Sequence, residues 1–430
     1  MSELTSVSPM PNLIRARQRF PVNPPVDISA AVTAELKPLL AGVPRGAEIA
    51  IAVGSRGITR LAEIVAAAIR VVREHGAFPV IVPAMGSHGG GTPSGQTELL
   101  AGYGVSEALL GVPLRSDMTV RSAGATAEGD EVVCGLSALG ADRVLLINRV
   151  KPHTDFRGAI GSGLVKMLVV GLGKHEGARR FHAAASRSGY ETALRQFAAV
   201  LKPVVPLLGG LAILEDQRHQ PVRLCGVPPA ALEAREAALC QQAHALMPRL
   251  PFDDVDLLIV DQMGKNISGT GMDPAIIGRM IHGYSTQIDP QQPPPRVRRL
   301  LVRELTPESH GNAIGIGMAD FTTERLVRAM DSEVTRINAL TALSIQGAKL
   351  PICFPNDREA IETGLCTLAL PDPTAARVVR IRDTLSVEVI EFSETLQGQE
   401  RKDCELELLS PPRAPVFDPA NNLPALISNP

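Results

Sequence analysis

Apolar and polar residues follow a pattern of short buried strands that alternate with amphipathic helices. Residues 48–53 and 78–83 are almost wholly apolar, which is typical of strands buried on both faces of a parallel sheet. Between them, residues 58–75 carry apolar side chains at helical spacing, and the pattern stops at Gly76. Each strand runs into a glycine-rich polar loop. The pattern therefore predicts an α/β fold with mainly parallel sheets.

The alternation continues along the chain and predicts two α/β domains. Further strands are expected at residues 118–122, 131–134, 144–147, 207–214, 255–260, 299–304, 352–354, 377–381 and 387–392. Further helices are expected at residues 28–40, 106–110, 190–201, 229–246, 323–343 and 357–370, and one begins near residue 94. Residues 163–171 are expected to form the first turns of a helix that resumes over residues 176–186. We expect an N-terminal domain over residues 1–250, a C-terminal domain over 251–395 with an active-site cleft between the two, and a surface-packed tail over 396–430.

Composition favours small-molecule chemistry. The chain is 45% hydrophobic and 20% charged, with a net charge of -2, so it is typical of a globular protein and has no excess of basic residues for nucleic acid or anionic membranes. Its six cysteines form no C-x-x-C pair, which disfavours a cysteine-rich metal site. The N-terminus lacks a signal-peptide core, and the longest apolar run is too short to cross a bilayer. We expect a soluble cytoplasmic protein, with homo-oligomer formation left open.

Ionisable residues are concentrated at residues 151–182, directly after the predicted strand 144–147. This segment holds three histidines, three lysines and six glycines. In an open α/β sheet, ligands bind beyond the carboxyl ends of the strands, where loops and helix N-termini converge. Three strand ends deliver Arg56, His88 and His153 to such an edge. We therefore expect the site there.

Each candidate residue has a chemical role and an ordinary alternative. The glycines around His88 allow a close approach to a ligand, but they also suit a plain turn. Lys166 lies among apolar residues, where lost hydration favours the neutral, nucleophilic amine, although its stem can also reach water from an amphipathic helix. Arg56 suits a bidentate grip on a carboxylate or phosphate, or a surface ion pair. His175 and His182, seven residues apart, also fit one solvated helix face.

Two other glycine-rich segments fail to match nucleotide-binding motifs. Lys265 lies in a glycine-rich loop without the G-x-x-x-x-G-K-[ST] spacing of a phosphate-binding loop. Residues 311–317 match a dinucleotide motif weakly and lack an acidic partner at the expected offset. The missing fingerprint disfavours oxidation with ordinary NAD.

Taken together, these stretches resemble the nickel-dependent lactate racemase family over about residues 45–395. That family has an arginine after the first strand and a G-[ST]-H motif after the second. A histidine, a glycine-rich stretch, a lysine and, sixteen residues later, a second histidine follow. The corresponding residues here are Arg56 in V-G-S-R, His88 in G-S-H, then His153, Lys166 and His182. Val53 stands where the family has an aspartate.

The resemblance implies a 2-hydroxy-acid racemase or epimerase with a nickel-pincer nucleotide, a cofactor made from nicotinate by partner biosynthetic enzymes. In the implied mechanism, a histidine takes the hydroxyl proton while a hydride passes to the cofactor and later returns to the other face of the keto acid. The implied roles are catalysis for His88 and His153, substrate binding for Arg56 and Lys265, cofactor binding for Lys166, Gly163 and Ser55, and nickel binding for His182. Because the loop between His153 and Lys166 is longer than in the family, Lys174 remains a rival for the covalent attachment.

Two other functions remain open. The polar loop around Lys265 differs from that of lactate racemases and favours a distinct subgroup that epimerises a sugar acid with the same cofactor. The basic loops also fit a non-catalytic protein that binds a nucleotide or an anionic metabolite.

Overall fold

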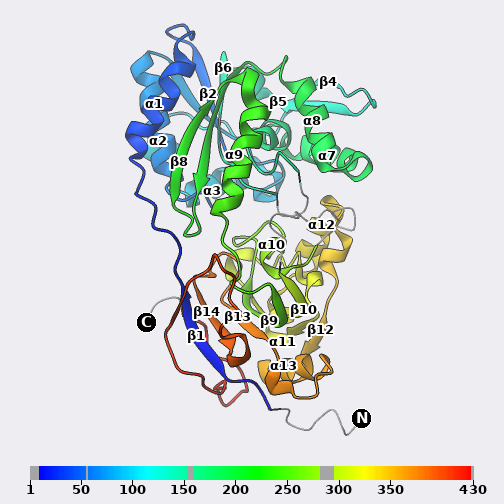
Figure 1. Ribbon diagram of the computed structural model, residues 1–430. Helices are drawn as coiled ribbons and strands as arrows, with labels where there is room; N and C mark the ends of the chain where they lie inside the picture. Colours follow the sequence, from blue (N-terminus) through cyan, green and yellow to red (C-terminus); the bar gives the residue numbers. More distant parts are fainter. Residues whose placement is uncertain (1–8, 55–56, 154–157, 281–294, 428–430) are drawn as a thin grey trace. The chain divides into compact units, whose positions relative to one another are not determined.

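The structure, a computed structural model, describes residues 9–54, 57–153, 158–280 and 295–427 (Figure 1). The chain forms two compact units. The N-terminal unit runs from Asn23 to Met247, and the C-terminal unit joins the described residues up to Val22 with those from Pro248 onward. We expected residues 1–250 in one domain and a separate tail. The structure instead groups the first arm and the tail with the C-terminal unit, because strand β1 pairs antiparallel with β14.

The N-terminal unit is built on a five-stranded sheet in the order β3-β2-β6-β7-β8. All neighbouring pairs are parallel except β7 with β8. The strands are β2 Glu48–Val53, β3 Phe78–Pro83, β6 Arg143–Arg149, β7 Leu207–Glu215 and β8 Pro221–Val227, and a separate hairpin joins β4 Val120–Ala125 to β5 Glu131–Gly135. The mainly parallel α/β fold predicted from the sequence is confirmed.

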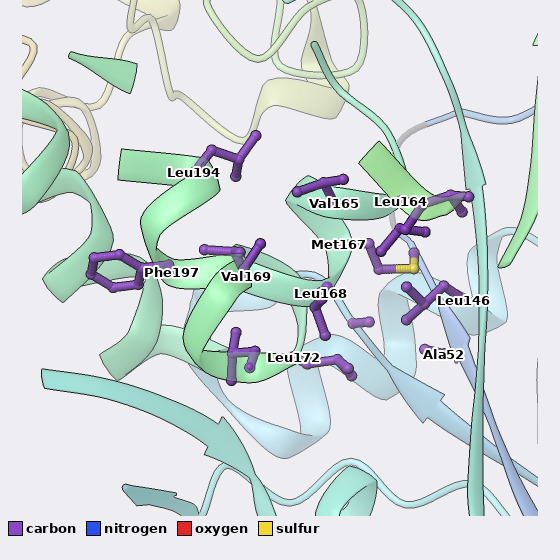
Figure 2. Close-up of a cluster of buried hydrophobic side chains, with 14 of the residues drawn as sticks. Ala52, Leu146, Leu164, Val165, Met167, Leu168, Val169, Leu172, Leu194 and Phe197 are labelled. Carbon is purple, nitrogen blue, oxygen red and sulfur yellow. The ribbon is translucent and has the colours of Figure 1, made fainter. Parts of the chain in front are cut away.

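Apolar residues alternate along β2 and β6 and thereby build a core on each face of this sheet. Helices α1 and α2 cover one face, and α6, α8 and α9 cover the other (Figure 1). Figure 2 shows Leu164, Met167 and Leu168 of the α6 region beside Leu146 of β6. The helices are α1 Ile28–Leu40, α2 Leu61–His75, α3 Pro93–Gly102, α4 Glu107–Leu110, α5 Leu136–Leu139, α6 Leu164–Lys166, α7 Lys174–Ser188, α8 Tyr190–Leu201 and α9 Leu232–Leu246.

The order of the strands reverses between β2 and β6. The chain passes from β2 to β3 on one side, and the next strands of the sheet, β6 and β7, add on the other side. The carboxyl ends are level, since Val53 pairs with both Pro83 and Ile147. Such a reversal separates the loops that follow the two central strands and leaves a ligand-binding crevice at their carboxyl ends. The predicted candidates therefore follow three neighbouring strands.

The C-terminal unit contains an eight-stranded sheet in the order β12-β11-β10-β9-β13-β14-β1-β15. It also reverses its strand order, between β9 and β13. Its strands are β1 Leu13–Gln18, β9 Asp254–Met263, β10 Arg296–Leu305, β11 Phe321–Thr323, β12 Ile352–Phe354, β13 Val378–Ile381, β14 Val389–Ser393 and β15 Leu406–Leu408. Its helices are α10 Pro274–Ile277, α11 Glu324–Ala329, α12 Ser332–Thr341 and α13 Asp357–Cys366.

The tail of the C-terminal unit is fixed by buried charges. Arg303 lies between Asp261 and Asp357, with N–O distances of 2.7 Å to each. The backbone N–H of Leu423 donates to Asp357 at 2.8 Å, and that of Leu426 donates to Asp261 at 3.1 Å. These bonds hold the described part of the tail against the C-terminal unit.

The helix predicted at residues 323–343 was wrong as a single element. It divides into α11 and α12 because Asp331 begins the second helix by accepting the N–H groups of Glu333 and Val334. Within the part of the chain that the structure describes, none of the helices has the length and hydropathy to cross a membrane.

Candidate active site

The segment after β6 brings His153 and Lys166 together at the carboxyl edge of the N-terminal sheet. The Nζ of Lys166 lies 2.7 Å from Nε2 of His153. His153 is buried, with 7% of its surface exposed, whereas Lys166 is half-buried. A lysine amine is only a donor when protonated, so a bond to Nε2 requires the imidazole tautomer with its proton on Nδ1. The pair can therefore pass a proton between two nitrogens.

The ring of Tyr190 joins this pair to His182. Tyr190 begins α8 and is buried, with 7% of its surface exposed. Its ring centroid lies 4.6 Å from that of His153 and 6.2 Å from that of His182. The Nζ of Lys166 lies 5.4 Å from the same centroid, which is within cation–π range. Three of the predicted residues thus surround one tyrosine.

The long loop between His153 and Lys166 is closed at its base. The backbone N–H of Lys151 donates to Ser162 at 2.9 Å, and the N–H of Ser162 donates back to Lys151 at 2.8 Å. Gly161 has to be glycine, because a Cβ there would collide with the carbonyl oxygen of Lys151. Residues 154–157 lie outside the described residues. Lys166 therefore contacts His153 although the two lie 13 residues apart in the chain.

Buried polar groups fix the backbone below Lys166. Asn148, near the end of β6, donates through Nδ2 to the carbonyl oxygen of Gly163 at 2.8 Å. Glu236 of α9 accepts the N–H of Val165 at 2.8 Å. Burial raises the pKa of the Glu236 carboxyl to about 7, although bonds from the Val165 and Leu164 amides oppose the rise. Lys166 is followed by a π-helical turn, Met167–Gly171, a rare geometry that is frequent at functional sites.

His88 lies on the loop after β3, which packs against the first half of α7. A Cβ on Gly86 of this loop would lie 3.5 Å from that of Ala178, and one on Gly91 would lie 3.0 Å from Nδ1 of His175. Gln96 of α3 donates to the carbonyl oxygen of Gly86 at 2.9 Å and to that of His88 at 3.3 Å. The loop is thereby held beside the helix that carries His182 further along.

Lys174 lies away from the His153–Lys166 pair, at the start of α7. It has a left-handed backbone with φ of 57° and only 1% of its surface is exposed. Its Nζ donates to the carbonyl oxygen of Pro83 at 2.7 Å. Burial lowers its pKa to about 8. Lys174 therefore fixes the end of β3, from which the His88 loop departs.

The predicted residues Ser55 and Arg56 lie outside the described residues, but the ends of their loop are described. Thr59 donates its backbone N–H to Oε1 of Glu215 at 3.0 Å, and Glu215 also forms an ion pair with Arg149 of β6. The carboxylate of Glu215 therefore fixes the end of the loop that contains Arg56.

Lys265 lies at the corresponding edge of the C-terminal sheet, after β9. Its Nζ donates to the carbonyl oxygen of Gly269 at 2.8 Å, and its N–H donates to Ser309 Oγ at 2.9 Å. The neighbouring residue Asn266 accepts the Thr306 hydroxyl at 2.7 Å. This edge is thus built on hydroxyl and backbone bonds.

The described residues contain no group of three or more His, Cys, Asp or Glu that could hold a metal ion by themselves. Cys134 and Cys240 are buried, and burial raises the pKa of each thiol to about 12, so neither supplies a ready thiolate. A metal at His182 would therefore need most of its donors from another molecule.

Sequence reasoning missed Tyr190, Glu236 and Glu215. The scarcity of tyrosine, with three in the chain, was a weak signal for Tyr190. Glu236 offered a better signal, because it falls within the apolar stripe of α9, whose buried residues are Leu232, Glu236, Leu239, Cys240 and Ala243. Nothing in the sequence distinguished Glu215 from a surface carboxylate.

No model of a protein family matches the chain, and no curated protein matches it. Among solved structures, the apoprotein of lactate racemase from Thermoanaerobacterium thermosaccharolyticum is similar, with a TM-score of 0.46 and 12% sequence identity. The match covers 87% of this chain and 89% of that one. A likeness at this level does not establish the activity of this chain.

Proposed function

We propose that this chain racemises or epimerises a 2-hydroxy acid with a nickel-pincer nucleotide. The observation that carries the proposal is the contact of 2.7 Å between Lys166 Nζ and His153 Nε2, with Tyr190 and His182 beside them. It combines a nucleophilic amine, a proton-transfer base and a nickel-binding imidazole at the strand-order reversal, where α/β proteins bind ligands.

The donor set fits this cofactor. Lys166 is half-buried and can form the covalent attachment, while His182 supplies one imidazole to nickel. The absence of a protein-only metal cluster among the described residues suits a metal whose other donors belong to the cofactor. When bound, the cofactor supplies an electron-poor carbon that accepts and returns a hydride.

Lys166 is a better candidate for the attachment than Lys174. The amine of Lys174 is bound to the Pro83 carbonyl and is almost completely buried. Its release would leave a buried carbonyl without this donor, which costs about 1–3 kcal/mol. The amine of Lys166 is half-buried, contacts the imidazole of His153 and lies 3.4 Å from Ser162 Oγ.

The covalent use of Lys166 would also change the role of His153. While the amine is not covalently attached, it occupies Nε2 of the imidazole. Once the lysine nitrogen is part of a covalent bond, Nε2 is available to accept the proton of the substrate hydroxyl. We assign the opposite acid–base role to His88 and carboxylate binding to Arg56 and Lys265.

Purification after co-expression with cofactor-making enzymes tests the proposal. We expect nickel in about equimolar amount, added mass on the peptide that contains Lys166, and stereochemical exchange of a 2-hydroxy acid. The Lys166→Arg variant is the control and should carry neither the mass nor the activity. Protein without nickel and without added mass would contradict the proposal, and ligand binding without turnover would indicate a binding protein instead.

A sugar acid is the second candidate substrate class. The observation that favours it is the polar loop after β9, where Asn266 is exposed beside the half-buried Lys265. Amide and hydroxyl groups recognise substrate hydroxyls and discriminate strongly against analogues that lack them. Exchange of aldonates, but not of lactate-sized acids, by the loaded protein would select this class.

A further inference from the structure

Glu236 is a completely buried carboxylate that touches the backbone which carries Lys166. It belongs to α9 and has 0% of its surface exposed. Its Oε2 accepts the N–H of Val165 at 2.8 Å, and Leu164 also donates its N–H to this carboxylate. These are amides of the first turn of α6, which have no partners within the helix. Glu236 therefore satisfies the start of α6 from a distant part of the chain.

Gly163 and Glu236 are complementary in shape. A Cβ on Gly163 would lie 2.5 Å from Oε1 and 2.8 Å from Oε2 of Glu236, closer than real carbon–oxygen contacts. On the same residue, the carbonyl oxygen of Gly163 accepts the Asn148 amide at 2.8 Å. The carboxylate can reach the amides of α6 only because residue 163 has no side chain.

The α6 segment cannot fix the position of Lys166 by itself. It comprises only Leu164–Lys166, and the following Met167–Gly171 turn is π-helical. A helix of this length is not stable without external contacts. Lys166 directly follows the two amides that Glu236 accepts, so a displaced backbone would move its amine away from His153.

We propose that Glu236 is a positioning residue that sets the amine of Lys166 against His153 by holding the backbone of α6, and that Gly163 is its required counterpart. The importance of this geometry for turnover rests on the proposed function. The positioning itself is a property of the chain without cofactor.

Competitive acylation of the full chain, without cofactor, tests this role. Acetic anhydride is used at pH 7, and peptide mass spectrometry compares the rate at Lys166 with that at the exposed Lys37. In the wild-type protein the imidazole of His153 can take the proton released by the amine, so Lys166 should react faster than Lys37. Glu236→Leu should lower this ratio by about tenfold, because the amide of Val165 loses its acceptor and the amine is misplaced. Glu233→Leu, on the same helix but paired with Arg195 and Lys202, is the matched control and should leave it unchanged.

A reciprocal pair of variants separates positioning from general stability. Gly163→Ala should lower the ratio like Glu236→Leu, because the new methyl displaces the carboxylate. Adding Glu236→Asp should restore part of it, since the shorter side chain makes room for the methyl. An unchanged ratio in both single variants, or no recovery in the double variant, overturns the proposal. Because no cofactor is involved, absent nickel in the loading experiment would refute the proposed function and leave this result standing.

Discussion

The two units present the same topological feature with different chemistry. Each sheet reverses its strand order once, between β2 and β6 in the N-terminal unit and between β9 and β13 in the C-terminal unit. At the first reversal, an amine, two imidazoles and a tyrosine ring lie together. At the second, Lys265 and the loop around it are bonded to backbone carbonyls and hydroxyls.

The comparison shows that strand order provides a place for a ligand, whereas the side chains at that place decide the chemistry. The reversal makes a place where loops diverge, in either unit. At the first reversal, Lys166 and His153 can exchange a proton with one another. At the second, the polar groups of the loop around Lys265 form hydrogen bonds mainly with backbone carbonyls and hydroxyls of the same unit. We therefore expect chemistry at the first and recognition at the second.

The largest difference in activity and in added mass should be found between variants of Lys166, at the first reversal, and of Lys265, at the second. Lys166→Arg keeps a positive charge but removes the nucleophilic amine, so racemisation should fall by about a thousandfold or more. Lys265→Arg should keep the added mass on the Lys166 peptide. Intact-protein mass and initial rates measure both. Added mass that persists in Lys166→Arg would place the attachment elsewhere.

If His153 is the base of the proposed reaction, His153→Gln should lower kcat by about a hundredfold to ten-thousandfold, because the acceptor of the hydroxyl proton is lost. The added mass and the nickel should remain. His175→Gln, at an exposed histidine of α7, serves as the matched control. Equal losses in the two variants would mean that the effect comes from charge or folding and not from proton transfer.

Stability should depend on pH at the first reversal. The pKa of Glu236 is raised to about 7, so the folded protein binds this proton more tightly than the unfolded chain. Its contribution is fully present below about pH 4.5 and is lost as pH rises through about 7, a change on the order of 3 kcal/mol. Glu233 raises this pKa and Arg195 lowers it.

Hydrogen exchange of the Leu164 and Val165 amides, compared between pH 5 and pH 8, measures this effect after correction for intrinsic rates. Glu236→Gln should remove the pH dependence. A slope that survives in this variant would have to come from another group.

The smallest effect is expected at the second reversal. Lys265→Ala should raise KM by about tenfold, equivalent to 1.4 kcal/mol, and change kcat less. Part of the change would reflect the lost bond to Gly269. Steady-state kinetics on the loaded protein measure both constants. A loss mainly in kcat would contradict the proposal that the first reversal carries the chemistry and the second binds the substrate.

Local patterns predicted the parallel core well. The limits of α1, β2, β3 and α8 agree with the expected ranges, because apolar runs there end at glycine, proline or polar residues. The position of β1 could not be foreseen, since its strand partners are β14 and β15, almost four hundred residues away. Likewise, the sequence order suggested His153, Lys166 and His182, but Tyr190 joins them only through the packing of α8.

The bridge between Lys151 and Ser162 brings together two residues that are far apart along the chain. Its two ends stay together although the chain between them leaves the sheet edge and returns, and His153 lies within that stretch while Lys166 lies after it. Counting positions between an imidazole and an amine therefore misjudges their proximity in this protein.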